Sequence, residues 1–116
     1  MTSPQKITDE NAESIGRPIF DKVIKSFINS NREEFIQHFP YLDDWITVDI
    51  FDEAVNALNR LGELQSTEYS TRTIKNENHV LLWNAHYKND ENTVHWKLFL
   101  DDSREQTIVK GFEFDR

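Results

Sequence analysis

The chain has 116 residues with no cysteine, and 21 acidic against 13 basic residues give it a formal net charge of −8. This length fits one domain whose core needs no metal or disulfide. The missing cysteine excludes disulfides, thiolate nucleophiles and cysteine-ligated zinc, and an acidic chain without a basic patch disfavours nucleic acids and anionic membranes as partners.

No targeting or membrane segment is expected. The start of the chain lacks the basic and apolar regions of a secretory signal, and no apolar run approaches membrane-spanning length. We therefore expect a cytoplasmic protein with a single domain over residues 1–116. Residues 1–16 are mostly polar and are expected to form a flexible N-terminal segment.

Apolar residues recur at helical spacing over residues 18–28, which predicts an amphipathic helix with one broad apolar face. Pro18 suits the first turn, where its missing N–H costs nothing, and Gly16 and Pro18 disfavour helix before that point. A second, short helix is predicted after Asn31, because Asn31 and Glu34 have the spacing of a capping box. The following proline ends it.

A third helix is predicted from Asp49, which can act as its N-cap, and the apolar residues from Phe51 to Leu61 share one face. Gly62 suits the left-handed position that closes a helix. Beyond Gly62 the apolar period becomes that of strands, joined by short polar connections. The predicted strands span about residues 64–73, 79–88, 93–101 and 107–115. Helices followed by strands predict an α+β domain, with the helices on one face of a four-stranded antiparallel meander.

Alternation within the strands predicts which side chains face the helices. A hairpin loop at residues 89–92 pairs Trp83 with Leu98, and its neighbouring pairs on the same face are also apolar. The next connection sets Trp96 beside Phe112. The core face is therefore expected to carry Trp83, Tyr87, Trp96 and Phe112, with the tryptophans mainly filling the core.

Lys110 is the polar exception on this predicted core face, beside Leu98. One interpretation is a lysine at the end of the sheet whose ammonium reaches solvent. The other is a cation in the wall of a pocket between helix and sheet, where it would meet an anionic ligand. Both interpretations stay open on the sequence alone.

The opposite face of the sheet carries His86, His95 and Glu113 in one predicted row across three strands. Two imidazoles and a carboxylate are a ligand set that zinc or iron can use. Polar residues on a solvated face are much commoner, so we expect no metal there. No cofactor is expected either.

A second row on this outer face, Leu82, Phe99 and Val109, is apolar. An apolar row on the outside of a sheet usually means that something covers it. We expect a homodimer through this face. The alternative is that the N-terminal segment, with Ile7 and Ile15, folds over it.

The chain contains few signals for catalysis. Its three glycines are dispersed, so there is no phosphate-binding loop, and no Gly-x-Ser-x-Gly or His-Glu-x-x-His motif occurs. The carboxylates are abundant, but none stands out as an acid/base pair.

The phrases INSNREEFIQHF and FDEAVNALNRLG, after one amphipathic helix and before an aromatic-rich meander, resemble the nuclear transport factor 2-like superfamily. Short bacterial members of unknown function are similar in ending a helix with Leu-Gly before the first strand, here Leu61-Gly62. The resemblance implies a cystatin-like curved sheet wrapped around a helix. It also implies a function among isomerases, cyclases, dehydratases and binding or dimerisation modules.

The core-facing positions depart from the catalytic members, because they hold no carboxylate pair and the first helix has no tyrosine. Our main hypothesis is a module that binds a small anionic or apolar ligand, or a partner protein. The alternative is a small acid/base enzyme with a pocket between the first helix and the sheet. The expected ligand-binding residues are Trp83, Tyr87, Trp96, Lys110 and Phe112.

Overall fold

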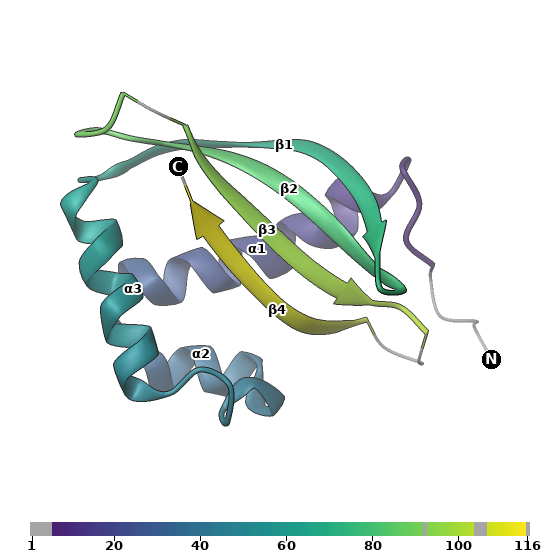
Figure 1. The fold of residues 1–116 in the computed structure, drawn as a ribbon, viewed down its shortest axis with the longest axis horizontal. Helices are drawn as coiled ribbons and strands as arrows, with labels where there is room; N and C mark the ends of the chain where they lie inside the picture. Colours follow the sequence, from purple (N-terminus) through teal and green to yellow (C-terminus); the bar gives the residue numbers. More distant parts are fainter. Residues whose placement is uncertain (1–5, 92, 104–106, 116) are drawn as a thin grey trace.

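The computed structural model describes residues 6–91, 93–103 and 107–115. Its helices precede its strands: α1 (Ala12–Ile28), α2 (Arg32–His38), the short 3-10 turn η1 (Pro40–Leu42) and α3 (Val48–Arg60), then β1 (Leu64–Lys75), β2 (Asn78–Tyr87), β3 (Val94–Asp101) and β4 (Ile108–Asp115). The strands pair antiparallel in the order β1-β2-β3-β4. The predicted α+β class with helices before a meander sheet is confirmed. Figure 1 shows α1 crossing behind the twisted sheet, with α2 and α3 to one side.

Helix α1 begins at Ala12, well before the predicted start at Pro18. Thr8 and Asn11 explain the early start, because each side chain accepts from the other's backbone N–H, at 2.6 Å from Thr8 N to Asn11 Oδ1 and 3.3 Å from Asn11 N to Thr8 Oγ1. These reciprocal bonds satisfy N–H groups at the helix start in the manner of a capping box. Part of the expected flexible segment, residues 1–5, lies outside the described residues.

Gly16 lies inside α1 and not before it, because the helix passes very close to β2 at this residue. A Cβ on Gly16 would collide with Cδ1 of Leu81 and lie 3.2 Å from the Trp83 ring. Glycine therefore costs helix propensity here and permits tight packing of helix on sheet. Pro18 is accommodated on the exposed side of the same helix.

The predicted cap of α2 is confirmed, since the Asn31 side chain accepts from the N–H of Glu34 at 3.0 Å. The predicted cap of α3 is wrong: Thr47, two residues before Asp49, accepts from the N–H of Ile50 at 3.2 Å. Asp49 instead lies in the first turn, where its negative charge interacts favourably with the positive end of the helix dipole.

The β2–β3 register differs from the prediction by two residues. Trp83 pairs with Trp96, where Leu98 was expected, because the hairpin is centred between Asn89 and Asp90, one residue earlier than predicted. A shift of two residues keeps every side chain on its predicted face. Trp83 and Trp96 are therefore on the core side as expected, and both are fully buried.

The β3–β4 register contains a bulge that changes the position of Lys110. Leu100 pairs with Val109 and Phe99 pairs with Gly111, so Lys110 is the extra residue between them. The predicted inward orientation of Lys110 is wrong, because the bulge leaves its side chain exposed. Val109 was placed on the outer face, and this too is wrong: it is 1% exposed and belongs to the hydrophobic core.

Aromatic rings form the centre of the core. Phe20 of α1 lies flat on Trp83, with ring centroids 4.7 Å apart, and meets Trp96 edge-on at 5.8 Å. Phe27 continues the contact from α1 to Phe112 of β4 at 5.4 Å. These large rings bury much of the apolar area that holds helix and sheet together.

Candidate ligand-binding site

A pocket of about 370 Å³ opens where the C-terminal half of α1 meets the end of α3 and the start of β1. This volume lies within the range of small-molecule sites, roughly 300–1,000 Å³. Its walls are mostly apolar, and Ile28 at the end of α1 is 59% exposed. The lining residues are Ile24, Phe27, Ile28, Leu58, Asn59, Gly62, Glu63, Leu64 and Tyr87.

Tyr87, at the end of β2, contributes a phenol to this pocket. Burial raises the pKa of Tyr87 above its ordinary value, and a polar interaction with the Trp96 indole offsets this only in part. Trp96 Nε1 has no partner within hydrogen-bonding geometry among the described residues, so its N–H acts on Tyr87 only as a nearby dipole. The phenol therefore stays protonated at neutral pH and can donate to a ligand.

A tight corner at Gly62 fixes one wall of the pocket. Gly62 has a positive φ of 86°, and a Cβ there would lie 2.7 Å from Nδ2 of Asn89. The N–H of Asn89 donates to the Leu61 carbonyl, and the N–H of Lys88 donates to the Glu63 carbonyl, each at 2.8 Å. The loop after β2 is thus tied to the α3–β1 turn, and the positive φ of Gly62 confirms its predicted role in closing the helix.

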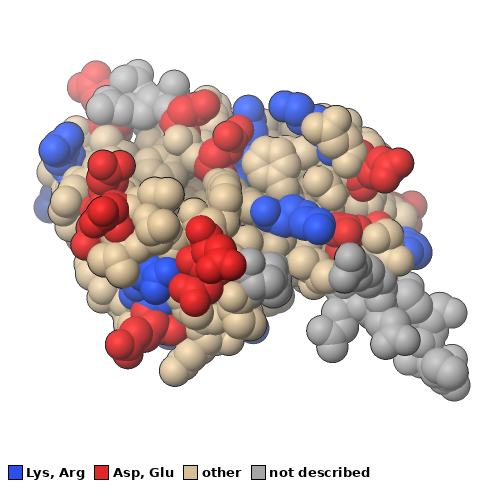
Figure 2. Space-filling model, turned by 60° about the horizontal axis from the view of Figure 1, so that its bottom comes forward, with Lys and Arg blue, Asp and Glu red and all other residues tan. Residues whose placement is uncertain are grey.

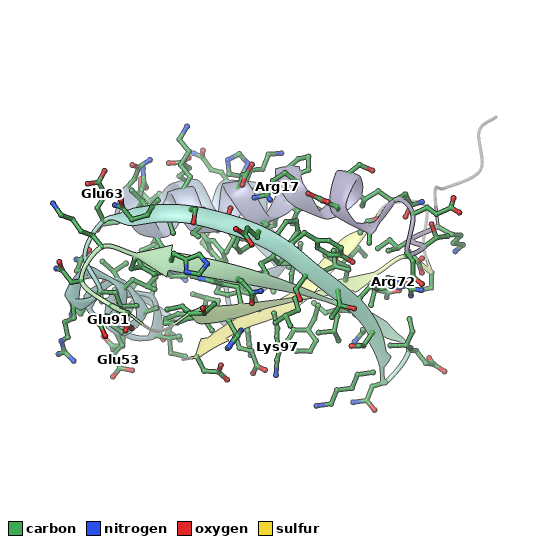
Figure 3. All side chains as sticks on the ribbon, turned by 90° about the horizontal axis from the view of Figure 1, so that it is seen from above. Arg17, Glu53, Glu63, Arg72, Glu91 and Lys97 are labelled. Atoms are coloured by element: carbon green, nitrogen blue, oxygen red, sulfur yellow. The ribbon has the colours of Figure 1, made fainter. Side chains whose placement is uncertain are left out.

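Glu63 is the one formally charged side chain among the described residues that line the pocket. Its side chain is exposed and makes no ion pair with any residue in the described ranges. Figure 3 shows Glu63 beside the start of β1, on the side of the sheet where α1 lies, with Arg72 at the opposite end of the molecule. Glu63 is therefore the formal charge that the described lining presents to a ligand.

The structure separates the five residues expected to bind a ligand. Only Tyr87 lines the pocket beside α1, because Trp83 and Trp96 are packed inside the core. Lys110 and Phe112 line a second depression of about 220 Å³, next to the half-exposed Trp45. One interpretation of the sequence placed Lys110 in the wall of a pocket between helix and sheet, where it would meet an anionic ligand. Lys110 does not line the pocket beside α1.

The predicted row of His86, His95 and Glu113 does not form. His95 pairs with Asn84 and lies 3.0 Å from its Oδ1, while Glu113 pairs with Lys97 at 3.5 Å. In the described ranges, no group of three His, Cys, Asp or Glu side chains is arranged to hold a metal ion. The shifted register and the β4 bulge together explain the loss of the row.

A partly buried polar cluster that the sequence did not reveal joins Arg72, His79 and Asp102. His79 Nε2 lies 2.9 Å from Asp102 Oδ2, and His79 Nδ1 lies 3.1 Å from Arg72 Nη1. The same carboxylate accepts the N–H of Ile7 at 2.9 Å, and Arg72 also contacts Asp9 at 2.9 Å. The cluster therefore holds the segment before α1 against the end of the sheet.

Burial alone would raise the pKa of Asp102. The N–H bond from Ile7 and the attraction of His79 outweigh it, so the pKa lies below the ordinary value of 3.8. An aspartate on one nitrogen of a histidine resembles part of a catalytic triad. Here Arg72, which can only donate, occupies the other nitrogen. The imidazole has no free lone pair for a substrate, so the cluster is structural.

The signal for this cluster was the position of His79 in its strand. Residues 79, 81 and 83 share one face by alternation, so a histidine at the start of this buried row needs a polar partner. That the partner would be Asp102 depends on the end of β3, which the predicted register misplaced.

Acidic and basic side chains are interspersed on the face that Figure 2 presents, without a continuous basic patch. None of the helices in the described ranges combines the length and apolar character needed to cross a membrane. No family model, curated protein or solved structure matches the chain.

Proposed function

We propose that this protein is a non-catalytic binding module that holds a small ligand with an apolar body in the pocket between α1, α3 and β1. The observation that carries the proposal is the pocket of about 370 Å³, with mostly apolar walls and a few polar groups. Apolar enclosure with few polar contacts is the usual form of a small-molecule site.

The exposed Ile28 side chain supports this proposal. It lines the pocket and is 59% exposed, so it offers apolar surface that a bound ligand would remove from water. The Tyr87 phenol and the Asn59 amide add hydrogen-bonding groups that can orient a bound molecule.

The alternative, an acid/base enzyme, has less support in this pocket. A general acid or base works best when its pKa lies near the working pH. Burial raises the pKa of Tyr87 away from neutrality, which suits a hydrogen-bond donor better than a proton-transfer group.

The element order, with helices before a twisted meander sheet, supports the proposed relation to the nuclear transport factor 2-like superfamily. The proposed homodimer now depends on Val80, Leu82 and Phe99 of the outer face, because Val109 faces the core. Light scattering at micromolar concentration tests it: Phe99→Lys should give a monomer if the dimer exists, and a wild-type protein that is already monomeric contradicts it.

The binding proposal is tested with N-phenyl-1-naphthylamine, a neutral dye whose fluorescence rises when it leaves water. Wild-type protein should bind it at one site, and Ile28→Gln, which removes an apolar wall, should weaken binding about tenfold, the equivalent of roughly 1.4 kcal/mol. Ile50→Gln is the matched control, since Ile50 is also a helical, exposed isoleucine but does not line the pocket. Equal binding by both variants, or no binding by wild type, would overturn the proposal.

A further inference from the structure

We propose that the ligand of this pocket is an apolar amine, whose ammonium group pairs with the carboxylate of Glu63 at the pocket entrance. This inference rests on the proposed function and adds the charge of the ligand to it. It begins from the composition of the lining, where Glu63 is the one formally charged side chain in the described ranges.

A backbone hydrogen bond fixes the position of Glu63, while its carboxylate is exposed to solvent. The Glu63 carbonyl accepts the N–H of Lys88 at 2.8 Å, directly after the corner at Gly62. No described cation pairs with the carboxylate, and the residue is exposed. A ligand ammonium can therefore reach Glu63 without displacing an internal ion pair.

The apolar walls complement this charge selection. They hold the apolar body of the ligand, while the exposed Glu63 carboxylate selects the sign of its charged end. Ile24, Phe27 and Leu58 line the same pocket and keep much of its inner surface apolar. A carboxylate ligand would meet the negative charge of Glu63 with no cation on the lining to compensate, so the pocket disfavours anions.

Two aromatic side chains also suit a cation. Phe27 and Tyr87 line the pocket, and aromatic faces attract ammonium groups through the ring quadrupole. The Tyr87 hydroxyl is both a donor and an acceptor, so it offers a polar contact to the ammonium group or to its neighbouring atoms. Lys110, the cation once expected here, lines the separate depression beside Trp45.

The experiment compares octylamine, octanol and octanoate as competitors of N-phenyl-1-naphthylamine. The three compounds have the same eight-carbon length and differ in charge at neutral pH. We expect octylammonium to bind about tenfold more tightly than octanoate, with octanol between them, and added salt to reduce the difference. In Glu63→Gln, the ratio of octylammonium to octanol affinity should fall about fivefold. Glu68→Gln, at an exposed position of β1 outside the pocket, should keep the wild-type ratio.

Each result has one meaning. Octanoate binding as tightly as octylammonium, or a Glu63→Gln ratio equal to the wild-type ratio, overturns the inference and leaves the binding module intact. Failure of all three compounds, octanol included, to displace the dye from the pocket overturns the proposed function itself.

Discussion

The imidazole of His79 hydrogen-bonds the carboxylate of Asp102, with 2.9 Å between Nε2 and Oδ2, at the end of the sheet farthest from the proposed pocket. Arg72 holds the other imidazole nitrogen, and the N–H of Ile7 reaches the same carboxylate. This contact ties the segment before α1 to β2 and to the end of β3.

Removal of the Asp102 carboxylate should destabilise the protein. Asp102→Ala leaves the N–H of Ile7 and the imidazole of His79 without their acceptor in a mostly buried site, at a cost of about 2–3 kcal/mol. Asp9→Ala is the control, because its carboxylate contacts Arg72 but is 80% exposed. That exposed pair should contribute less than about 1 kcal/mol. Equal losses in urea unfolding would contradict this account of the cluster.

Acid should release the N-terminal segment. The folded-state pKa of Asp102 lies below its ordinary value of 3.8, so its carboxylate stabilises the fold above that pH. This stabilisation is lost as pH falls below 3.8 and through the lowered folded-state pKa. Hydrogen exchange measured over this acid range should show the amides of residues 7–12 losing protection before those of β3. Simultaneous loss of protection in both segments would argue against a separate anchor.

Gly16→Ala should destabilise the protein, although alanine is the better helix former by about 1 kcal/mol. The new methyl group would collide with Leu81, which is fully buried and has little room to move. Overpacking typically costs about 1–3 kcal/mol, so we expect a net loss of about 1 kcal/mol in thermal or urea unfolding. Ser14→Ala, at an exposed position of the same helix, is the comparison. A stabilised Gly16→Ala variant would show that the sheet yields to the methyl group.

Lys110→Met should leave octanol binding within about twofold of wild type, because Lys110 lines the other depression. Tyr87→Phe should weaken octanol binding about threefold to tenfold, the effect of one lost hydrogen bond. Competition against the dye measures both affinities. The reverse order of effects would place the ligand beside Trp45 and exclude the pocket at Tyr87.

The sequence predicted the faces of the strands better than their registers. Trp83 and Trp96 share the core face in either β2–β3 register, because the side-chain pattern repeats every two residues. The pattern therefore could not distinguish a pairing of Trp83 with Leu98 from the observed pairing with Trp96. A bulge does not preserve the faces in this way. The one extra residue in β4 moved Lys110 and Val109 from their predicted faces.

The sequence predicted only some of the residues that form the pocket. Tyr87 was expected on the core face and is buried there. Gly62 was expected to close a helix, and its positive φ confirms this role. Glu63 gave no signal, because it lies in the short connection between α3 and β1. Ile28 was placed on the apolar face of the first helix, but at the end of α1 it is 59% exposed. Their shared pocket depends on how α1, α3 and β1 pack together, which local patterns do not contain.

The most direct test of the binding proposal is a ¹H–¹⁵N correlation spectrum recorded during titration with octylamine. The largest shifts should fall on the backbone amides of Ile24, Leu58, Gly62 and Tyr87, with a single saturating curve. Shifts concentrated at Trp45, Lys110 and Glu113, or scattered without saturation, would contradict a ligand site between α1, α3 and β1.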